Sequence, residues 1–376
     1  MNAVRTEKGR PVAGNGADIE FSLALHDKTG KYFHGRDLIE VTSDLLHRQL
    51  FWRFALDSVP GGLTAKVIGR LLSLEVNARV RWAAFDRLTP RQRRRRPVAH
   101  MDPFTTLLHR LSSRDLVLCH DVGPLTHPGL FDRPVTAAYR KAYAEITDVG
   151  PHMVFVSRAS QSAFHGLFGG AFASSRVIYP PLRSEIIAAE QSPAPGVAKP
   201  FLLTVGGLGA RKNQKRAIEA FQRSGLAACG VGYVLCGGRE PGHEAIAELA
   251  RRTPGVLLLG FVSDPVLNWL YAHAAGFVLP SLLEGFGVPV AEAIARGLTP
   301  LVSAGGVLHE VAGDGALLVD PDNVDDIAGA MRRLVEMPAS EAERRRAQLA
   351  GSIRRFTPEA FAGAWRDAIG EAARID

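Results

Sequence analysis

Long apolar runs are missing from this sequence of 376 residues. A helix needs about 18 or more consecutive apolar residues to cross a bilayer, and the nearest run, LAACGVGYVLCGG at 226–238, is too short. The opening segment, MNAVRTEKGRPVAGNGAD, lacks the apolar core that a secretory signal needs. We therefore expect a soluble, cytoplasmic protein in which residues 1–18 form a flexible N-terminal tail.

Cysteine is scarce as well, with Cys119, Cys229 and Cys236 as the only three. Their odd number argues against a disulfide framework, and their spacing fits no zinc pattern, so a reducing cytoplasm is the simplest setting. Hydrophobic residues make up 46% of the chain and charged residues 22%. That composition is typical of globular proteins, and the length is sufficient for two domains with separate cores.

Acidic residues are too few in the first half to balance the basic ones. Up to residue 190 there are 26 Lys+Arg against 18 Asp+Glu, whereas the remainder has 19 against 20. Much of the excess lies in one proline-flanked loop that carries Arg91, Arg93, Arg94, Arg95 and Arg96. Such a run is most often a solvated loop, and the alternative is contact with anionic lipid at the inner face of the cytoplasmic membrane. No nucleic acid is expected, because neither an aromatic platform nor a DNA-binding motif accompanies the run.

Short β-rich runs alternate with longer helical runs from about residue 19 onward, which predicts parallel sheets covered by helices on both faces. In the first half we expect strands at 19–25, 79–85, 115–121 and 152–157, and helices at 36–50 and 137–148. The alternation stops in the segment AAEQSPAPGVAKP and restarts with the strand FLLTV at 201–205.

The sequence therefore predicts an α/β protein with two tandem Rossmann-like doubly wound domains. We expect an N-terminal domain at 19–190, a linker at 191–200 and a C-terminal domain at 201–356. Residues 357–376 predict a helix that packs back on the N-terminal domain, with Thr357 as its cap and Pro358 at its first position. Ligands of paired doubly wound domains are expected in the cleft between them.

The stretch PSLLEGFGVPVAEAIARG at 280–297 reads as the end of a strand, a tight turn and a helix. The unpaired N–H groups at a helix start favour an anion, and Gly285 and Gly287 let a ligand approach the backbone. Glu284 and Glu292 flank the turn and are better suited to hydroxyl groups than to phosphate. An anion flanked by hydroxyls describes a phosphorylated sugar or a nucleotide, whereas the alternative is an acidic first turn that complements the helix dipole.

A second glycine-rich turn follows the strand at 201–205, in the sequence GGLGARKN. Small residues followed by Arg211 and Lys212 at the start of a helix fit a diphosphate. The turn lacks the Gly-Lys-Ser/Thr of a Walker motif, and Lys212 stands where a dinucleotide fingerprint has its third glycine. The alternative is a structural turn with basic residues on the surface.

In the first domain, LVLCHDVGPLTHP places His120 and Asp121 after an apolar strand, where open α/β sheets present their ligand-binding residues. The two side chains could form a base or a hydroxyl-binding pair, or a local hydrogen-bonded corner. His127 and the loop at 30–36 are weaker candidates. Asp320 and Asp322 have the Asp-x-Asp spacing of some metal-dependent transferases, but helix capping explains them without a metal.

These motifs resemble those of a known family, the retaining glycosyltransferases of family 4 (glycosyl transferases group 1), which have the two-domain B-type fold. The resemblance covers most of the chain and is strongest from about 200 to 325. It is carried by GGLGARKN, LLLGFVSDPVLNWLYAHA, PSLLEGFGVPVAEAIARG and HEVAGDGALLVDP, and less strongly by CHDVGPLTHPGLF and VFVSRASQSAF. Two glutamates separated by seven residues, as at Glu284 and Glu292, are the family's hallmark.

The resemblance implies roles for the matched positions. His120, Glu284, Lys212 and Arg211 would be catalytic, with Lys212 and Arg211 neutralising the leaving diphosphate. The acceptor side would include Gly35, His120 and Asp121. The donor-binding residues would be Gly207, Arg211, Lys212, Phe261, Val262, Glu284, Gly285, Phe286, Gly287, Val288 and Glu292. Many family members have arginine where this chain has Gly207, so the task of that arginine would pass to Arg211.

The function implied is retaining transfer of a hexosyl group from a sugar nucleotide to a glycan or lipid-linked acceptor, in bacterial surface polysaccharide or glycolipid synthesis. Mannose from GDP-mannose is the preferred donor, and UDP-sugars remain open. No metal and no further cofactor are expected. Two alternatives are a non-catalytic subunit that binds sugar nucleotides, and a phosphorylase or epimerase with the same fold.

Overall fold

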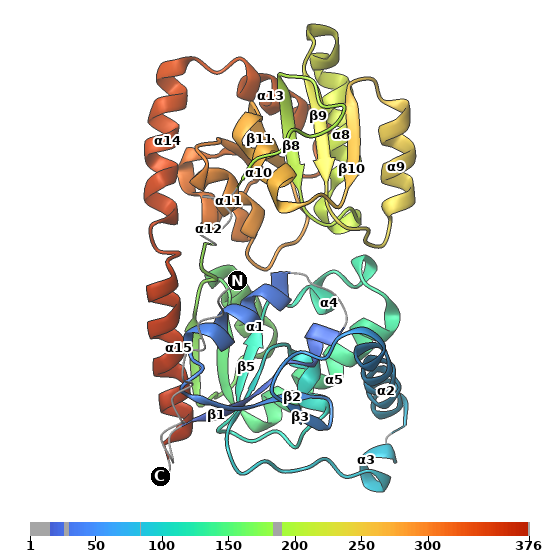
Figure 1. Cartoon of the computed structure of the whole chain (residues 1–376), viewed down its shortest axis with the longest axis vertical. Helices are drawn as coiled ribbons and strands as arrows, with labels where there is room; N and C mark the ends of the chain where they lie inside the picture. The colour runs from blue at the N-terminus through green and yellow to red at the C-terminus, as the bar shows by residue number, and fades with distance from the viewer. Residues whose placement is uncertain (1–15, 26–29, 83, 183–189, 375–376) are drawn as a thin grey trace, which may run out of the picture. The chain divides into compact units, whose positions relative to one another are not determined.

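The computed structural model describes residues 16–25, 30–82, 84–182 and 190–374. The chain folds as two compact units (Figure 1). Unit 1 comprises Met1–Pro180 and Pro358–Asp376, and unit 2 comprises Pro181–Thr357. The first strand begins at Ala17, inside the segment expected to be a tail, and residues 1–15 of that tail lie outside the described part of the chain.

Unit 1 contains a seven-stranded sheet among its described residues, in the order β3-β2-β1-β4-β5-β6-β7. All neighbouring strands are parallel except β2 and β3, which form an antiparallel pair. The strands are β1 (Ala17–Glu20), β2 (Leu46–Phe51), β3 (Phe54–Leu56), β4 (Val98–His100), β5 (Leu116–Cys119), β6 (His152–Phe155) and β7 (Ser174–Val177).

The α-helices of unit 1 connect these strands or follow them. They are α1 (Gly30–Val41), α2 (Gly62–Arg81), α3 (Phe85–Leu88), α4 (Gly123–Thr126), α5 (Arg133–Val149), α6 (Arg158–Phe168) and the C-terminal α15 (Pro358–Ala373). Three short 3-10 helices are η1 (Ser22–Leu25), η2 (Pro103–Leu107) and η3 (Pro128–Leu130). Although α15 is last in the sequence, it contacts α1, β1 and β5 and buries Trp365 completely. The chain therefore finishes in the unit in which it began.

Three expectations for the first half are wrong, and the first two concern residues 30–50. The segment 36–50, expected to be one helix, is divided between α1 and β2. Leu46, Leu50 and Phe51 are buried in β2, which pairs with β1, so sheet pairing prevails over a leucine spacing that also suits a helix. The loop expected at 30–36 is the first half of α1.

The strand expected at 79–85 is also wrong, because α2 continues to Arg81. Arg79 lies one turn after Glu75 on the buried side of the helix, and their ion pair of 2.6 Å favours helix there. The strand expected at 19–25 is shorter, with β1 ending at Glu20 and η1 following it. The backbone N–H of Ser22 donates to the Glu20 carboxylate at 3.2 Å, which turns the chain away from the sheet.

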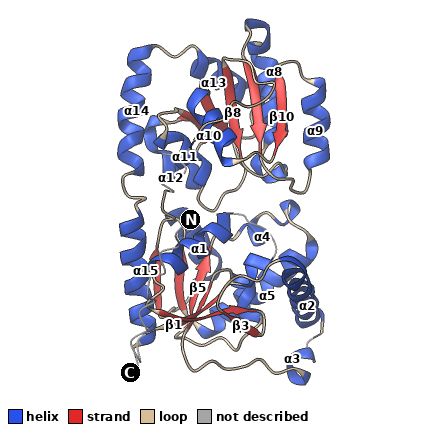
Figure 2. Ribbon diagram, viewed as in Figure 1, coloured by secondary structure: helices blue, strands red, loops and turns tan. Residues whose placement is uncertain are grey.

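Unit 2 contains a six-stranded parallel sheet among its described residues, in the order β10-β9-β8-β11-β12-β13. Figure 2 draws the strands of this sheet in red and the helices of the unit in blue. Renumbered within the unit, this is the strand order 3-2-1-4-5-6 of the Rossmann fold. The strands are β8 (Phe201–Val205), β9 (Gly232–Cys236), β10 (Val256–Gly260), β11 (Gly276–Leu279), β12 (Pro300–Ser303) and β13 (Leu317–Val319). Strand β8 has the bounds expected from the sequence, 201–205, and both units together confirm the predicted fold class.

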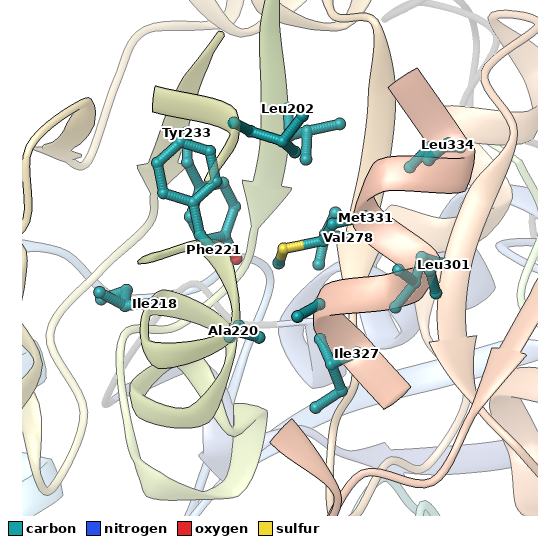
Figure 3. Close-up of a cluster of buried hydrophobic side chains, with 14 of the residues drawn as sticks. Leu202, Ile218, Ala220, Phe221, Tyr233, Val278, Leu301, Ile327, Met331 and Leu334 are labelled. Atoms are coloured by element: carbon teal, nitrogen blue, oxygen red, sulfur yellow. The ribbon is translucent and has the colours of Figure 1, made fainter. Parts of the chain in front are cut away.

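The helices of unit 2 alternate with its strands. The α-helices are α8 (Gln214–Ser224), α9 (His243–Arg252), α10 (Asp264–His273), α11 (Val288–Ala295), α12 (Gly306–Ala312), α13 (Val324–Val335) and α14 (Ala339–Ile353). The 3-10 helices are η4 (Ala210–Lys212), η5 (Leu226–Cys229) and η6 (Gly313–Gly315). One core cluster lies where α8 and α13 cover the sheet: Phe221 of α8 and Met331 of α13 pack with Leu202 of β8 (Figure 3). This rigid core fixes the loops that follow β8 and β11.

We predict that Gly35→Ala destabilises the protein, because a Cβ at this position of α1 would lie 2.3 Å from the buried Phe21 ring. Overpacking of this kind costs about 1–3 kcal/mol of unfolding free energy. Gly363→Ala in α15 is the matched control, since nothing lies within 4 Å of its Cβ position. The control should be neutral or stabilising by up to about 1 kcal/mol. Urea unfolding of both variants measures the difference, and equal midpoints would contradict the prediction.

Candidate functional site

The glycine-rich turn after β8 and the turn after β11 are neighbours in unit 2. The strand order of the sheet reverses between β8 and β11, and open α/β sheets bind ligands beyond the carboxyl ends of strands at such a position. The backbone N–H of Leu282 donates to the Arg211 carbonyl at 3.0 Å, which joins the two turns directly. The structure therefore brings together the two motifs that the sequence singled out.

A buried ion pair connects these turns. The Lys212 ammonium donates to Oε1 of Glu284, and the two side chains are 7% and 6% exposed. The Ser281 hydroxyl donates to the same oxygen at 2.9 Å. Burial opposes ionisation of the carboxyl, but the charges of Lys212 and Arg211 prevail and hold the pKa of Glu284 below its ordinary value. The carboxylate is therefore ionised at neutral pH.

Arg211 lies between two carboxylates. Its guanidinium is 3.2 Å from Oε2 of Glu284 and 3.7 Å from Oε1 of Glu240. The Glu240 side chain also covers the backbone at Gly207, where an added Cβ would lie 1.8 Å from Glu240 Oε1. Any side chain at 207 would displace Glu240, so the glycine and the position of Glu240 depend on each other.

Two further residues hold the glycine-rich turn, and sequence reasoning assigned neither of them. The Gln214 amide accepts from Gly209 N–H at 3.0 Å and donates to the Gly207 carbonyl at 2.8 Å. The Asn213 amide donates to the carbonyls of Pro280 at 3.0 Å and Pro321 at 2.7 Å. Asn213 has a left-handed backbone, with φ of 59°, and lies between η4 and α8. The sequence could have indicated both residues, because they directly follow Lys212 at the start of α8.

The turn after β11 depends on glycine for a steric reason. Gly287 has φ of 91°, and a Cβ there would lie 2.4 Å from Leu308 of α12. Phe286 is buried and packs edge-on against Phe356, with ring centroids 5.0 Å apart. Val288 begins α11, directly after Gly285, Phe286 and Gly287. The start of the helix thus lies close to Glu284, as expected.

Glu292 lies on α11 and is turned toward the interior of unit 2. It is 4% exposed and accepts from the Tyr271 hydroxyl at 3.1 Å. The Arg296 guanidinium lies over the Tyr271 ring at 4.6 Å from its centroid. The two glutamates of the motif therefore have different neighbours: Glu284 contacts cations, whereas Glu292 contacts a phenol.

The remaining donor-side candidates follow β10. Phe261 is 84% exposed and Val262 is half-buried, so the phenyl ring is open to a ligand. Of the two aspartates with Asp-x-Asp spacing, Asp320 accepts from Asp322 N–H at 2.9 Å, and Asp322 pairs with Arg216 at 3.1 Å. The residue that caps α13 is Asn323, so the expectation that the aspartates themselves form the cap is wrong.

In unit 1 the corresponding reversal of strand order lies between β1 and β4. His120 follows β5, is buried, and shares a hydrogen bond of 3.0 Å between Nε2 and the Met101 carbonyl. Burial, followed by the nearby Lys31 charge, lowers the pKa of His120 to about 3, so the ring is neutral. Asp121 accepts from Gly123 N–H at 2.8 Å, which makes it a corner residue with different contacts from those of His120. Gly35 faces Phe21.

Other polar residues at this edge of unit 1 escaped sequence reasoning. Lys31 lies 2.6 Å from Asp102 and 2.9 Å from the Tyr139 hydroxyl, and Asp102 is 1% exposed. His34 is buried, its ring lies 5.8 Å from that of His120, and neither of its nitrogens has a hydrogen-bond partner. The sequence indicated Lys31 and His34 only through the segment 30–36, which was a weaker candidate. No motif around Asp102 or Tyr139 indicated a functional residue there.

Residues 187–351 match the family model described as glycosyl transferases group 1. Among curated proteins, the chain is 30% identical over 235 residues to the O-antigen chain mannosyltransferase B of Escherichia coli, a match covering 59% of this chain and 61% of the relative. It is 40% identical over 83 residues to the O-antigen chain mannosyltransferase RfbU of Salmonella typhimurium, covering 22% and 24%. The aligned part thus spans about three fifths of the first relative and a quarter of the second.

Solved structures resemble the whole chain at low sequence identity. The Anabaena protein Alr3699/HepE, solved with UDP and glucose, matches with a TM-score of 0.65 at 17% identity, covering 94% of this chain and 99% of that one. Trehalose-6-phosphate synthase OtsA matches with a TM-score of 0.67 at 13% identity, covering 94% and 98%. The chain has the B-type glycosyltransferase fold.

A prediction concerns Glu20, which ends β1 and is completely buried. Burial raises the pKa of Glu20 to about 8, although the Ser22 hydroxyl and N–H favour its ionised form. Because the folded pKa exceeds the unfolded value of 4.5, folding holds a proton that is lost as pH rises. Between about pH 5 and about pH 8, the unfolding free energy of the native protein should fall relative to that of Glu20→Gln, by at most about 1.4 kcal/mol per pH unit.

Urea unfolding at several pH values tests this. Glu40→Gln is the control, because Glu40 is exposed on α1 and its replacement should leave the pH profile unchanged. Parallel profiles for the native protein and Glu20→Gln would show that Glu20 does not hold the proton.

Proposed function

Because residues 187–351 match the family model described as glycosyl transferases group 1, we propose that this protein is a retaining glycosyltransferase. Its donor is a sugar nucleotide, with mannose from GDP-mannose preferred, and its acceptor is a glycan or lipid-linked glycan of a bacterial surface polysaccharide or glycolipid. One observation carries the proposal: buried Lys212, with Arg211 beside it, lies where α8 begins and is held by Glu284 from the facing turn. Fixed positive charge at a helix start suits a diphosphate.

In the proposed reaction the acceptor hydroxyl attacks the anomeric carbon as its bond to the diphosphate breaks. The hydroxyl proton passes to the leaving phosphate oxygen, on the same face of the sugar, so that configuration is retained without a protein nucleophile. Negative charge grows on the diphosphate, and Lys212 and Arg211 stabilise it as preorganised cations. Glu284 positions both cations before the donor binds and offers its carboxylate to sugar hydroxyls.

The other matched residues complete the donor and acceptor sides. Glu292 binds the ribose, the backbone of Gly285, Phe286 and Gly287 holds the sugar and phosphate, and Phe261 borders the base. Neutral His120 offers a hydrogen-bonding nitrogen to the reacting sugar, because its other nitrogen is committed to Met101. An imidazolium in that position would add positive charge where the sugar ring itself becomes positive, so the lowered pKa of His120 suits the reaction.

The choice of GDP-mannose depends on sequence relatives rather than on fold. The two curated relatives from Escherichia coli and Salmonella typhimurium are named as mannosyltransferases, whereas Alr3699/HepE was solved with UDP. Identity with that structure is only 17%, so it supports the fold and leaves the base open. A UDP-sugar is therefore the second donor to be tested.

We further propose that the protein contacts an anionic membrane. Helix α2 supports this contact better than the arginine loop does. Arg91 pairs with Glu145 and Asp86, and Arg96 contacts His47 at 2.8 Å, so much of the loop's charge is engaged inside unit 1. Only Arg93 and Arg95 of its five arginines are fully exposed.

Helix α2 presents an exposed apolar face. Leu63, Val67, Leu71 and Leu74 recur at intervals of three and four residues and are 77%, 49%, 41% and 66% exposed. At about 100° per residue they lie opposite the buried face that includes Leu72. Residues 53–96 carry 11 Lys+Arg against 3 Asp+Glu. An apolar helix face in basic surroundings favours docking in the interface of an anionic membrane. No described helix is long and apolar enough to span one.

We expect Lys212→Ala to remove at least about half of the thermal stabilisation given by GDP, GDP-mannose, UDP and UDP-glucose. A ligand at about 100 times its dissociation constant adds about 2.7 kcal/mol, and a lost charged hydrogen bond removes about 1.5–3 kcal/mol of binding. Lys215→Ala is the matched control, because Lys215 is exposed on α8, three residues after Lys212, and its loss should change binding little. Thermal unfolding across the four ligands measures both the site and the preferred base.

Mannosyl transfer to a lipid-linked acceptor is then measured with the stabilising nucleotide sugar. Binding without turnover would favour a non-catalytic subunit over the transferase. Stabilisation by sugar phosphates alone would favour a phosphorylase, and equal binding by Lys212→Ala would remove the proposed diphosphate site.

For the membrane, the double substitution Leu63→Ser and Leu74→Ser should weaken binding to vesicles of phosphatidylglycerol and phosphatidylcholine. Each leucine contributes about 1.5–3 kcal/mol when the membrane buries it, so the two substitutions should weaken vesicle binding about a hundredfold or more in co-sedimentation. Leu167→Ser, at an exposed site on α6, is the control. Equal sedimentation of all three proteins, or no dependence on the anionic lipid, would contradict the proposal.

A further inference from the structure

A small cavity lies in unit 1 behind helix α2. It has a volume of about 50 Å³ and is lined by residues of α2, of the turn between β2 and β3, of the arginine loop and of the segment after η2. The charged or polar lining residues used below are Arg53, Glu75, Arg79, Arg91, Arg94 and His109. Four of these six are arginines, so the cavity is strongly basic.

The single acid among these six residues is already saturated. Glu75 accepts from Arg79 Nε at 3.0 Å, and its other oxygen accepts from Arg53 Nε at 3.0 Å and from Trp52 Nε1 at 2.8 Å. Burial alone would raise the pKa of Glu75, but its hydrogen bonds and the nearby arginines lower it, so the carboxylate stays ionised. One carboxylate cannot neutralise four guanidinium groups.

Acids just outside the cavity reduce this excess without removing it. Asp86 lies against Arg79 and Arg91, and Glu145 pairs with Arg91. Lys141 donates to Asp86 at 2.9 Å and restores one positive charge. These contacts occupy Arg79 and Arg91, and they leave the charge of Arg94 unmatched.

Arg94 and His109 each bring a polar nitrogen that has no hydrogen-bond partner. Nε of Arg94 and Nε2 of His109 are both buried and unpaired. Within the described part of the chain, no carboxylate lies within 4.0 Å of Arg94. The Asp18 carboxyl on β1 is more distant: burial raises its pKa, and the Arg94 charge partly offsets that rise. His109 is 3% exposed, and burial together with the Arg94 charge lowers its pKa to about 3, which leaves a neutral ring. Buried unpaired donors beside a cavity indicate a missing occupant.

We propose that this cavity binds a phosphate group. A tetrahedral oxyanion accepts several hydrogen bonds at once, so it can pair with Nε–H of Arg94 and with a proton on Nε2 of His109. The planar guanidinium fork suits phosphate oxygens, and Arg53 and Arg91 supply further positive charge at the cavity. A water molecule would meet the two donors but would leave the excess charge unbalanced. An anion accounts for both observations.

The proposed phosphate site is independent of the proposed sugar-nucleotide site, which consists of residues of unit 2. It is also distinct from the exposed face of α2, because Glu75 and Arg79 lie on the buried side of that helix. The phosphate comes either from a free or soluble phosphate ester or from a phospholipid headgroup near α2. In either case, occupation would fix the packing of α2 on unit 1.

Isothermal titration of the full chain with inorganic phosphate tests the proposal, with chloride at equal ionic strength as the reference. Arg94→Gln should weaken phosphate binding about tenfold or more, as expected for a lost charged hydrogen bond. Arg95→Gln is the matched control: it removes the same charge from the same loop, but Arg95 is exposed and does not line the cavity. The control should bind phosphate within about twofold of the native protein.

A second readout does not depend on variant folding. In the native protein, the NMR resonances of the His109 ring should shift when phosphate is added. The dissociation constant from these shifts should equal the one from isothermal titration. Absence of saturable binding, or equal binding by Arg94→Gln and Arg95→Gln, would overturn the proposal and leave the cavity to water.

Vesicles of phosphatidylglycerol distinguish the two phosphate sources. Isothermal titration with phosphate is repeated on protein that is bound to the vesicles. If the binding heat disappears, a lipid headgroup occupies the cavity; if it persists, the occupant is free phosphate or a soluble ester. Sugar-nucleotide binding by Arg94→Gln should match that of the native protein, so failure here is separable from failure of the transferase proposal.

Discussion

The buried ion pair between Lys212 and Glu284 is the interaction on which the arrangement of unit 2 depends. Two charges with about 7% exposure are costly to desolvate, so their presence needs a compensating arrangement. Ser281, Arg211 and the backbone bond from Leu282 provide it, and they tie the turn after β8 to the turn after β11. A donor diphosphate would meet cations that are already in place, which lowers the reorganisation that binding and charge development require.

At the carboxyl ends of the strands of unit 1, burial keeps some side chains neutral instead of holding them in ion pairs. Glu20 is held protonated and His120 neutral, because desolvation dominates where no strong partner of opposite charge is close. Lys31 keeps its charge: burial alone would lower the pKa of its ammonium, but the Asp102 carboxyl 2.6 Å away and the Tyr139 hydroxyl raise that pKa well above its ordinary value. At these strand ends the first unit thus presents the neutral groups of Glu20 and His120 beside one ion pair. The second unit presents two cations, Lys212 and Arg211, that carboxylates hold in place.

Sequence patterns predicted the strands at 115–121, 152–157 and 201–205, whereas they failed over 36–50 and 79–85 of unit 1, and the difference has a physical reason. Strand β8 is buried throughout and lies between Pro200 and Gly206, so it reads as a short apolar run with clear ends. Segment 36–50 carries leucines that suit a helix or a strand, and only pairing with β1 decides between them. Most of the predicted donor-side residues lie in glycine-rich turns, which can be recognised in the sequence. Lys31, Asp102 and Tyr139 are far apart in the chain, and only the fold brings them together.

Gly207 shows how a departure from a family pattern can be read once neighbours are known. An arginine there would need the space that the Glu240 carboxylate occupies, 1.8 Å from the position of a Cβ. Glu240 in turn lies 3.7 Å from Arg211, so the glycine admits an acid that helps to orient an arginine four residues later. Positive charge is thereby supplied from the end of the turn instead of its beginning. The geometry supports Arg211 as the replacement, because Glu240 and Glu284 hold its guanidinium from two sides next to Lys212.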